Sequence, residues 1–453
     1  MSSEVVAKKL KISENVCEDN PNCAHWVQRK KRFCKMTVKA GQKYCGEHQP
    51  AVELQTPQDT TACDDNVRIP CPLDAKHTVF KKKLQKHLKI CNARDKGDSP
   101  AYIEKGINTD AETNACPDYS KLRIHDLPDE EFYKIVATVK ELYAKYVENT
   151  IEAVCLQHKL LDEELAKSEY GPEARKHIIQ AAALLGILDS EQQLQPSTSY
   201  IEFGAGKGHL AFYLAQLLES LPASQVVLVD RMSLRHKKDN KIEDRSLVHR
   251  IRADIADFRM ASLELLQRTR RCVAVSKHLC GAATDLTLRC ITQPGCENAD
   301  KKAPDTEFVL IALCCHHRCD WQSYVGKSYF QAHELTSRDF AVITKMASWA
   351  ICGTGMSRER RRALEEQSQK PEDVVDANVT QRLCLAERER VGDMCKRILD
   401  YGRLQYLREH GYEAVLKYYV ARDVTLENVC LLARKVGASK CHGDGKECSS
   451  SQN

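Results

Sequence analysis

The sequence lacks any run of about 18 apolar residues, the shortest that spans a membrane as a helix, so a transmembrane protein is excluded. Residues 1–11 hold no apolar core followed by small residues, so no secretory signal is predicted. No repeat with a period of 20–50 residues is visible, which excludes solenoids. With 42% hydrophobic and 29% charged residues, the composition also excludes collagen, coiled coils and full disorder. These absences leave a soluble globular chain of 453 residues, long enough for two or more domains.

Cysteine, by contrast, is abundant, with 22 residues. In a chain without a secretory signal, this number predicts free thiols and metal ligands in place of disulfides. We therefore expect an intracellular reducing compartment, which is the nucleus, the cytoplasm or both.

A first metal site is predicted in residues 21–50, from the spacing Cys23-x10-Cys34-x10-Cys45-x2-His48. Three thiolates and one imidazole suffice for a closed tetrahedral zinc site. The alternative is a set of ordinary thiols in a polar tail. The segment is too short to bury an apolar core, so without a bound metal it would have almost no source of folding free energy. The metal site is therefore the favoured interpretation.

A second zinc site is predicted in residues 68–95, from Cys71-x5-His77-x9-His87-x3-Cys91. His87 and Cys91 are four residues apart in a predicted helix, so both ligands lie on one side of it. A chance coincidence of four such residues is the less favoured interpretation.

Both metal modules are strongly basic, although the net charge of the chain is only +5. This concentration of positive charge favours binding to an RNA backbone over a merely solvated surface. Trp26, Phe33 and Tyr44 are either small-core residues or surfaces for base stacking, and we expect two of them in the core. The basic residues are Arg29, Lys30, Lys31, Arg32, Lys35, Lys39 and Lys43 in the first module and Lys76, Lys81, Lys82, Lys83, Lys86 and Lys89 in the second.

We expect residues 92–122 to form a linker. The pattern of apolar residues in the segment 125–437 predicts a single α/β domain. Apolar residues at spacings of three and four predict a helix after Pro128, and a second helix is predicted from Pro172 to Leu188. Short apolar runs then alternate with helical segments, which is typical of a parallel sheet. A long insertion, with a helix through Arg403, precedes the last two strands, which we expect to form an antiparallel hairpin at the sheet edge. Strands are predicted near 200–203, 225–229, 248–252, 272–276, 307–313, 413–420 and 428–432.

A glycine-rich turn follows the first of these strands, with Gly204, Gly206 and Gly208. Its Gly-x-Gly-x-Gly spacing lacks the interval that a dinucleotide pyrophosphate needs. Glu202 precedes the turn, where a carboxylate repels a diphosphate but attracts the ammonium group of a cofactor that carries an amino acid. Asp230 ends the next strand, placed to accept hydrogen bonds from ribose hydroxyls, and Asp254 follows the third, placed for an adenine amino group.

This order of a glycine turn, a ribose acid and an adenine acid resembles the S-adenosylmethionine site of class I methyltransferases. A nicotinamide-dependent dehydrogenase is the competing interpretation.

The fourth and fifth strands end in Ser276-Lys277-His278-Leu279-Cys280-Gly281 and Leu313-Cys314-Cys315-His316-His317-Arg318-Cys319. In a doubly wound sheet, ligands bind at the carboxyl ends of the strands. The Lys, His and Cys side chains of these two segments therefore offer a base near neutral pH and positive charge for an RNA phosphate. A third zinc site from Cys314, Cys315, His316, His317 and Cys319 is a weaker alternative, because adjacent residues chelate one metal poorly. An inert thiol cluster is the other alternative.

Together, the two Cys/His clusters, the Glu202 glycine turn, Ser276–Gly281 and Cys314–His317 resemble the Trm13 family of eukaryotic tRNA methyltransferases. The resemblance covers residues 20–436 without the linkers. It implies a class I methyltransferase Rossmann-like sheet with N-terminal helices, preceded by two small zinc-finger modules. It also implies methyl transfer from S-adenosylmethionine to the ribose 2′-OH of nucleotide 4 in the acceptor stem of glycine, proline or histidine tRNAs. The second finger alone, which also occurs in a minor-spliceosome protein and in gametocyte-type proteins, implies only RNA binding.

The catalytic base is left open among Lys277, His278, His316 and His317. One alternative function is a catalytically silent zinc-finger RNA-binding adaptor, for example in RNA processing. Another is a methyltransferase that acts on protein or small molecules. The sequence indicates no membrane partner and no obligate protein partner.

Overall fold

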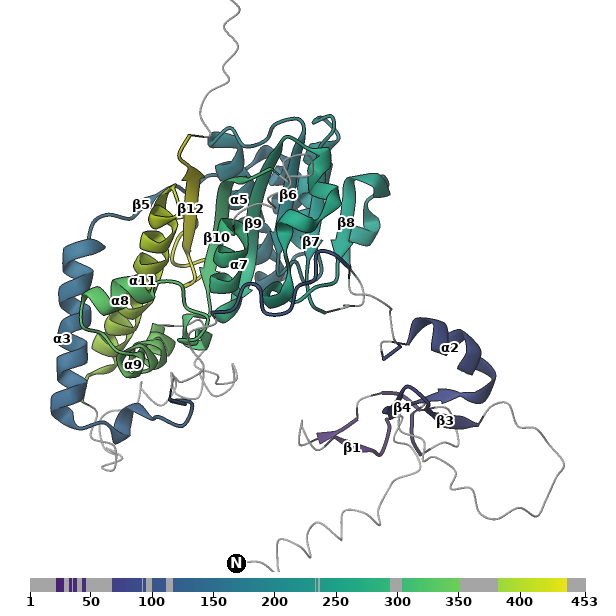
Figure 1. Cartoon of the computed structure of the whole chain (residues 1–453), viewed down its shortest axis with the longest axis horizontal. Helices are drawn as coiled ribbons and strands as arrows, with labels where there is room; N and C mark the ends of the chain where they lie inside the picture. The colour runs from purple at the N-terminus through teal and green to yellow at the C-terminus, as the bar shows by residue number, and fades with distance from the viewer. Residues whose placement is uncertain are drawn as a thin grey trace, which may run out of the picture. The chain divides into compact units, whose positions relative to one another are not determined.

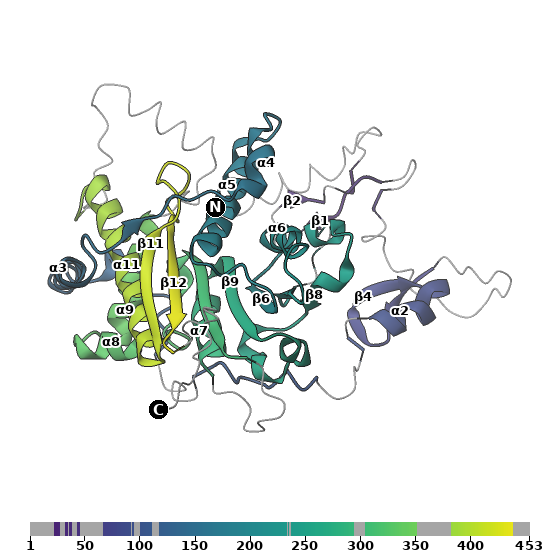
Figure 2. The same cartoon turned by 90° about the horizontal axis from the view of Figure 1, so that it is seen from above.

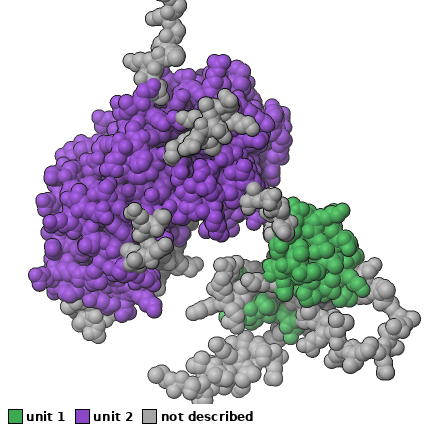
Figure 3. All heavy atoms as spheres, viewed as in Figure 1, with its two compact units in different colours: residues 1–99 green, residues 100–453 purple. Residues whose placement is uncertain are grey.

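The computed structural model describes residues 22–27, 32–34, 36–38, 43–45, 67–91, 93–94, 100–110, 117–232, 234, 237–293, 304–350 and 382–437. The chain divides into two compact units, residues 1–99 and residues 100–453 (Figure 3). His48, the fourth predicted ligand of the first finger, lies outside the described residues, as does the segment 358–372 of the predicted insertion.

Unit 1 contains the two predicted metal modules. In the first, β1 (Trp26–Val27) pairs antiparallel with β2 (Arg32–Phe33). In the second, β3 (Arg68–Cys71) pairs antiparallel with β4 (Asp74–Phe80), and the chain continues through η2 (Lys81–Lys83) into α2 (Leu84–Ile90; Figure 1). The predicted helix that carries His87 is therefore confirmed.

Unit 2 is built on one eight-stranded sheet with the order β5-β11-β12-β10-β9-β6-β7-β8. The five strands from β10 to β8 are parallel to one another. β12 runs antiparallel to both β10 and β11, which confirms the predicted hairpin, and β5 adds a short parallel edge that the sequence did not reveal (Figure 1). The strands are β5 (Glu152–Ala153), β6 (Thr198–Phe203), β7 (Gln225–Val229), β8 (Val248–Ile251), β9 (Arg271–Cys280), β10 (Thr306–Cys314), β11 (Tyr412–Tyr418) and β12 (Val429–Lys435).

The central strands were predictable because helices cover both of their faces, which favours apolar runs such as 226–229 in β7 and 308–313 in β10. All residues of β6 and β7 are buried. α5 and α6 pack on one face of the sheet, while α7 and the C-terminal half of α11 pack on the other (Figure 2). Among the described residues of unit 2, the helices with four or more residues are α3 (Asp129–Tyr146), α4 (Asp162–Ala166), α5 (Pro172–Ser190), α6 (His209–Leu218), η6 (Lys238–Lys241), η10 (Glu264–Arg268), α7 (Ala282–Thr292), α8 (Lys327–Ala332), α9 (Ser337–Ala347) and α11 (Leu385–Glu409).

A separate helical layer packs beside the sheet. It consists of α3, α8, α9 and the N-terminal half of α11, which share a core of their own. The face of α3 predicted from spacing is the buried one, since Phe132, Ile135 and Val139 are at most 3% exposed. None of the described helices has both the length and the apolar character needed to cross a membrane.

The linker predicted over residues 92–122 is wrong for residues 100–110. Ile103 forms an antiparallel bridge with Phe258, and Tyr102 packs against the same core. The amide of Asn108, which is fully buried, donates to the carbonyls of Ile255 and Phe258 at 2.6 and 2.8 Å. This segment is polar in sequence because its stability comes from hydrogen bonds to the sheet domain, so it belongs to unit 2.

We predict that Asn108→Ala destabilises unit 2 by about 1–3 kcal/mol, because two buried carbonyls lose their donor. Chemical denaturation of the full chain measures this change, and Lys105→Ala, on the exposed side of the same segment, is the matched control. Equal stability of the two variants would show that residues 100–110 are a linker after all.

Candidate cofactor site and metal centres

The glycine-rich turn lies at the carboxyl end of β6 and leads into α6. Gly204, Gly206 and Gly208 all have positive φ, at 64°, 53° and 71°, a conformation that side chains oppose. A Cβ atom on Gly208 would come within 2.7 Å of the Asp239 carboxylate. A Cβ on Gly206 would be in ordinary van der Waals contact with the carbonyl oxygen of Gly204 at 3.9 Å and with Leu234 at 4.0 Å, so its positive φ, and not a close neighbour, favours glycine at this position. The turn therefore presents bare backbone to a ligand.

Two residues that the sequence analysis missed hold this turn in place. Arg250 donates from Nη1 to the carbonyl of Gly206 at 3.0 Å and from Nη2 to Asp239 at 2.8 Å. Asp239 is 5% exposed, so this ion pair is largely shielded from water. The sequence signal was weak, because Asp239 lies in a polar stretch that reads as a loop.

Glu202 is buried beneath the turn, at 4% exposure. Its Oε2 accepts the backbone N–H of Ala211, in the first turn of α6, at 2.9 Å. Burial raises the pKa of Glu202 to about 8, although the Ala211 N–H and the charge of Lys277 oppose the shift. A cationic ligand group near this carboxylate would favour its ionised form.

Asp230 directly follows β7, and Asp254 lies three residues after the end of β8. Asp230 accepts the backbone N–H of Gly206 at 2.8 Å through Oδ2 and that of Met232 at 2.7 Å through Oδ1. Asp254 accepts the Ala256 N–H, and its Oδ2 lies 3.8 Å from Arg231, the residue after Asp230. The structure thus brings the glycine turn and both predicted acids to one edge of the sheet, in the order of β6, β7 and β8.

Lys277 and His278 lie near the end of β9, next to β6. Lys277 is 7% exposed, and its Nζ donates to the carbonyl of His177 in α5 at 3.1 Å. Burial lowers the pKa of Lys277 to about 8, although Glu202 pulls it upward. His278 is exposed, and its backbone carbonyl would lie 3.2 Å from a Cβ on Gly204. His278 therefore adjoins the glycine turn. Its ring meets that of His177 edge-on, with centroids 5.4 Å apart, and burial together with the charge of Lys277 lowers its pKa to about 4.

The structure corrects the expectation that His316 is a candidate base. Its ring is 1% exposed, and its Nε2 lies 2.7 Å from the Asp400 carboxylate. A substrate cannot reach a ring enclosed in this way. His317 is partly exposed and remains a candidate, and its Nδ1 has no hydrogen-bond partner among the described residues.

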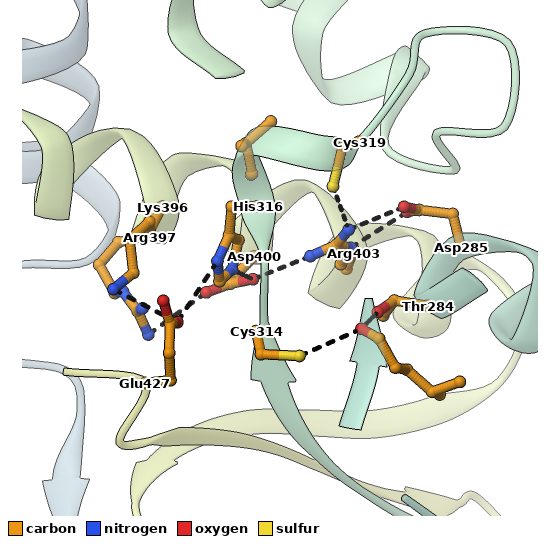
Figure 4. Close-up of polar contacts among 12 residues, drawn as sticks. Thr284, Asp285, Cys314, His316, Cys319, Lys396, Arg397, Asp400, Arg403 and Glu427 are labelled. Atoms are coloured by element: carbon orange, nitrogen blue, oxygen red, sulfur yellow. Dashed lines mark hydrogen bonds and ion pairs between the residues drawn. The ribbon is translucent and has the colours of Figure 1, made fainter. Parts of the chain in front are cut away.

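Asp400 belongs to a buried charge network that joins α11 to the ends of α7 and β10 (Figure 4). Arg403 donates to Asp285 at 2.7 Å and to Asp400 at 3.1 Å, and all three side chains are at most 1% exposed. Burial alone would raise the pKa of Asp400, but His316, Arg397 and Arg403 lower it to about 2. The sequence did not reveal this network, because charged residues in a helix usually face water.

The second finger has the geometry of a tetrahedral metal site. Nε2 of His77 and of His87 lie 3.1 Å apart, and the Sγ atoms of Cys71 and Cys91 lie 3.7 Å apart. Nε2 of His87 lies 3.2 Å from Sγ of Cys71, and Sγ of Cys91 lies 3.6 Å from Nε2 of His77. Zinc with bonds of about 2.0–2.3 Å requires ligand separations of about 3.3–3.8 Å. These four residues therefore fit zinc.

In the first finger, Sγ atoms of Cys23, Cys34 and Cys45 lie within 4.8 Å of one another. The expectation of a small core for its aromatic residues is wrong for two of them. Trp26 and Phe33 are 42% and 50% exposed and form an edge-to-face pair with ring centroids 5.0 Å apart.

Comparison with protein-family models gives three matches. The model described as "Methyltransferase TRM13" covers residues 179–434. "CCCH zinc finger in TRM13 protein" covers residues 21–49, and "U11-48K-like CHHC zinc finger" covers residues 68–92. The matches to the two finger models coincide with the two clusters of ligand atoms.

Similar curated proteins include the mouse "tRNA:m(4)X modification enzyme TRM13 homolog", 32% identical over 91% of this chain and 94% of that protein. The Saccharomyces cerevisiae "tRNA:m(4)X modification enzyme TRM13" is also 32% identical, over 94% of this chain and 98% of that protein. Among solved structures, human N-acetylserotonin methyltransferase with SAM matches at 10% identity and a TM-score of 0.25, over 66% of each chain. At that score, the match adds nothing to the strand order described above.

We predict that Glu202→Gln stabilises the protein by about 1–3 kcal/mol near pH 8, since it removes a carboxyl that burial disfavours in its charged form. The native carboxyl keeps its proton up to about pH 8, whereas the unfolded one releases it near 4.5. Between these values the native state binds more protons, so wild-type stability falls as pH rises and the advantage of the variant grows.

Thermal unfolding of both proteins at about pH 5.5 and about pH 8 measures this difference. Glu219→Gln, an exposed carboxyl at the end of α6, is the control and should change nothing. A difference that does not widen with pH would contradict the buried, protonated state of Glu202.

Proposed function

The chain belongs to the TRM13 methyltransferase family, and from this we propose that it methylates the ribose 2′-OH of nucleotide 4 in the acceptor stem of tRNA. S-adenosylmethionine is the proposed donor, and glycine, proline and histidine tRNAs are the proposed substrates. The names of the curated relatives support a tRNA substrate, and nucleotide 4 rests on the family resemblance. The ribose oxygen as acceptor and the individual tRNAs rest on the family resemblance.

The observation that carries the proposal is the row of acceptors at the ends of β6, β7 and β8. Gly204, Gly206 and Gly208 form a turn of positive φ that has no side chains, which lets an adenosyl donor lie against bare backbone. Asp230 would hold the ribose hydroxyls, Asp254 the adenine amino group, and Glu202 the ammonium group of the methionine part. Each of these carboxylates also accepts a backbone N–H, so binding of the donor is what distinguishes the enzyme from a catalytically silent scaffold. When bound, the sulfonium supplies an already activated methyl group.

The base that accepts the proton of the ribose 2′-OH must be reachable by the substrate, so we choose it among the solvent-exposed candidates. His278 is exposed beside the glycine turn and can take the proton of the 2′-OH as its oxygen attacks the methyl group. His317 is the second candidate. Lys277 is tied to α5 beneath the turn, which suits a positioning and electrostatic role. Holding the two reactants in line would account for most of the acceleration, because the donor is intrinsically reactive.

The zinc fingers are proposed to hold the tRNA. Lys81, Lys82 and Lys83 form η2 and are exposed, as required for contacts with phosphates. The exposed pair of Trp26 and Phe33 offers flat surfaces on which an unpaired base at the end of the acceptor stem could stack. The nucleus and the cytoplasm, as sites of tRNA maturation, remain the proposed locations.

We predict that the purified protein transfers labelled methyl groups from S-adenosylmethionine to an unmodified glycine tRNA. Nuclease mapping should place the 2′-O-methyl group at nucleotide 4. The matched control is the same tRNA with a 2′-deoxyribose at nucleotide 4, which lacks the acceptor oxygen and should remain unmethylated. Methylation of the deoxy substrate would show that the acceptor is a base atom or another position.

We predict that His278→Ala lowers the rate of methyl transfer by about 10²–10⁴-fold while the affinity for S-adenosylmethionine stays unchanged. Single-turnover assays give the rate, and calorimetry with the donor gives the affinity. His410→Ala, an exposed histidine at the end of α11, is the control. Full activity in both His278→Ala and His317→Ala would remove the histidine assignment.

A further inference from the structure

Three cysteines meet at the ends of β9 and β10, outside the two fingers. Cys280 and Cys314 are register partners on these parallel strands, and their Sγ atoms lie 4.0 Å apart. Cys315 follows directly, and all three Sγ atoms lie within 4.8 Å of one another. Tetrahedral zinc–thiolate sites need sulfur separations of about 3.8 Å, so only a small approach separates this cluster from a coordinating one.

This cluster differs from the third site that sequence spacing suggested. His316 is bonded to Asp400, and Cys319 accepts a hydrogen bond from Arg403 at 3.0 Å, so both belong to the buried charge network (Figure 4). Cys280 takes part in their place, although it is 34 residues from Cys314 in the sequence. Only the pairing of β9 with β10 brings the three thiols together.

The backbone at both strand ends is held in uncommon conformations. Cys315 has φ of 53°, in the left-handed region that a non-glycine residue adopts only at a cost of about 1–2 kcal/mol. Gly281 has φ of 63°, and a Cβ atom there would lie 2.4 Å from the carbonyl oxygen of Arg318. The loops after β9 and β10 are therefore in close backbone contact. The thiol of Cys315 points toward those of Cys280 and Cys314.

From this geometry we infer that Cys280, Cys314 and Cys315 form a third zinc site, with three thiolate ligands and one position left for solvent or substrate. Thiolates select soft or borderline ions such as Zn²⁺. No fourth ligand atom joins the cluster among the described residues. Three protein ligands with one open position are the pattern of zinc sites that activate a bound oxygen, whereas closed structural sites use four.

The site adjoins the proposed catalytic end of the sheet. His278 and Cys280 are both exposed and alternate with the buried Leu279, so they lie on the same side of β9. An ion held here would join the ends of β9 and β10 beside the proposed base. Zinc binding itself does not depend on the proposed methyl transfer.

The test is the zinc content of the full-length protein, measured by elemental analysis after removal of loosely bound metal. We expect three zinc ions per chain in the wild type and two in Cys280→Ser or Cys315→Ser. Cys155→Ser, an exposed cysteine outside all three clusters, is the matched control and should keep three. Two ions in the wild type, with no change in Cys280→Ser, would overturn the inference.

A second measurement covers the case in which a single variant loses metal by unfolding. In a Cys23→Ser and Cys71→Ser variant, both fingers are disabled, and added Co²⁺ should still bind with thiolate-to-metal charge-transfer absorption at one ion per chain. Absence of this absorption, or an intact mass that shows a disulfide between Cys280 and Cys314, would refute the site. Neither measurement uses tRNA or a methyl donor, so failure of the zinc site and failure of the methyl-transfer proposal are distinguishable.

Discussion

The parallel alignment of five strands is the constraint on which the rest of the molecule depends. Because β10, β9, β6, β7 and β8 all run in one direction, their carboxyl ends meet at one edge of the sheet. Residues from widely separated parts of the sequence thereby become neighbours. Glu202, Asp230, Asp254, His278 and Cys314 each follow or end one of these strands. The chemistry proposed here is possible only because the sheet brings these ends together.

The insertion between β10 and β11 is held to this sheet by buried charges, with Arg403 paired to Asp285 and Asp400. Such a network is costly to desolvate and adds little net stability, but removal of one partner typically costs about 3–5 kcal/mol. It therefore acts as a specific anchor that fixes α11 against the loop after β10. The same loop carries Cys315 and His317, so the anchor also determines how these side chains are presented.

The two units obtain their stability in different ways. Unit 2 buries a large apolar core on both faces of its sheet. The fingers contain few buried apolar residues among those described, and metal binding is expected to contribute on the order of 10 kcal/mol to the folding of each. Because unit 1 does not need these side chains for a core, it can expose the aromatic rings of Trp26 and Phe33 as well as Lys81, Lys82 and Lys83. This arrangement suits a module that binds RNA.

The sequence by itself determined the elements whose signal is local. Short apolar runs identified the strands from β6 to β12, the spacing around Phe132 identified the buried face of α3, and ligand spacing identified the second finger. It failed where the deciding interactions join distant residues. The polar segment around Asn108 read as a linker because its partners, Ile255 and Phe258, lie about 150 residues away. Only the tertiary structure could bury His316 and bring Cys280 to Cys314, because strand pairing and the low-dielectric core, and not residue type, decide which side chains meet.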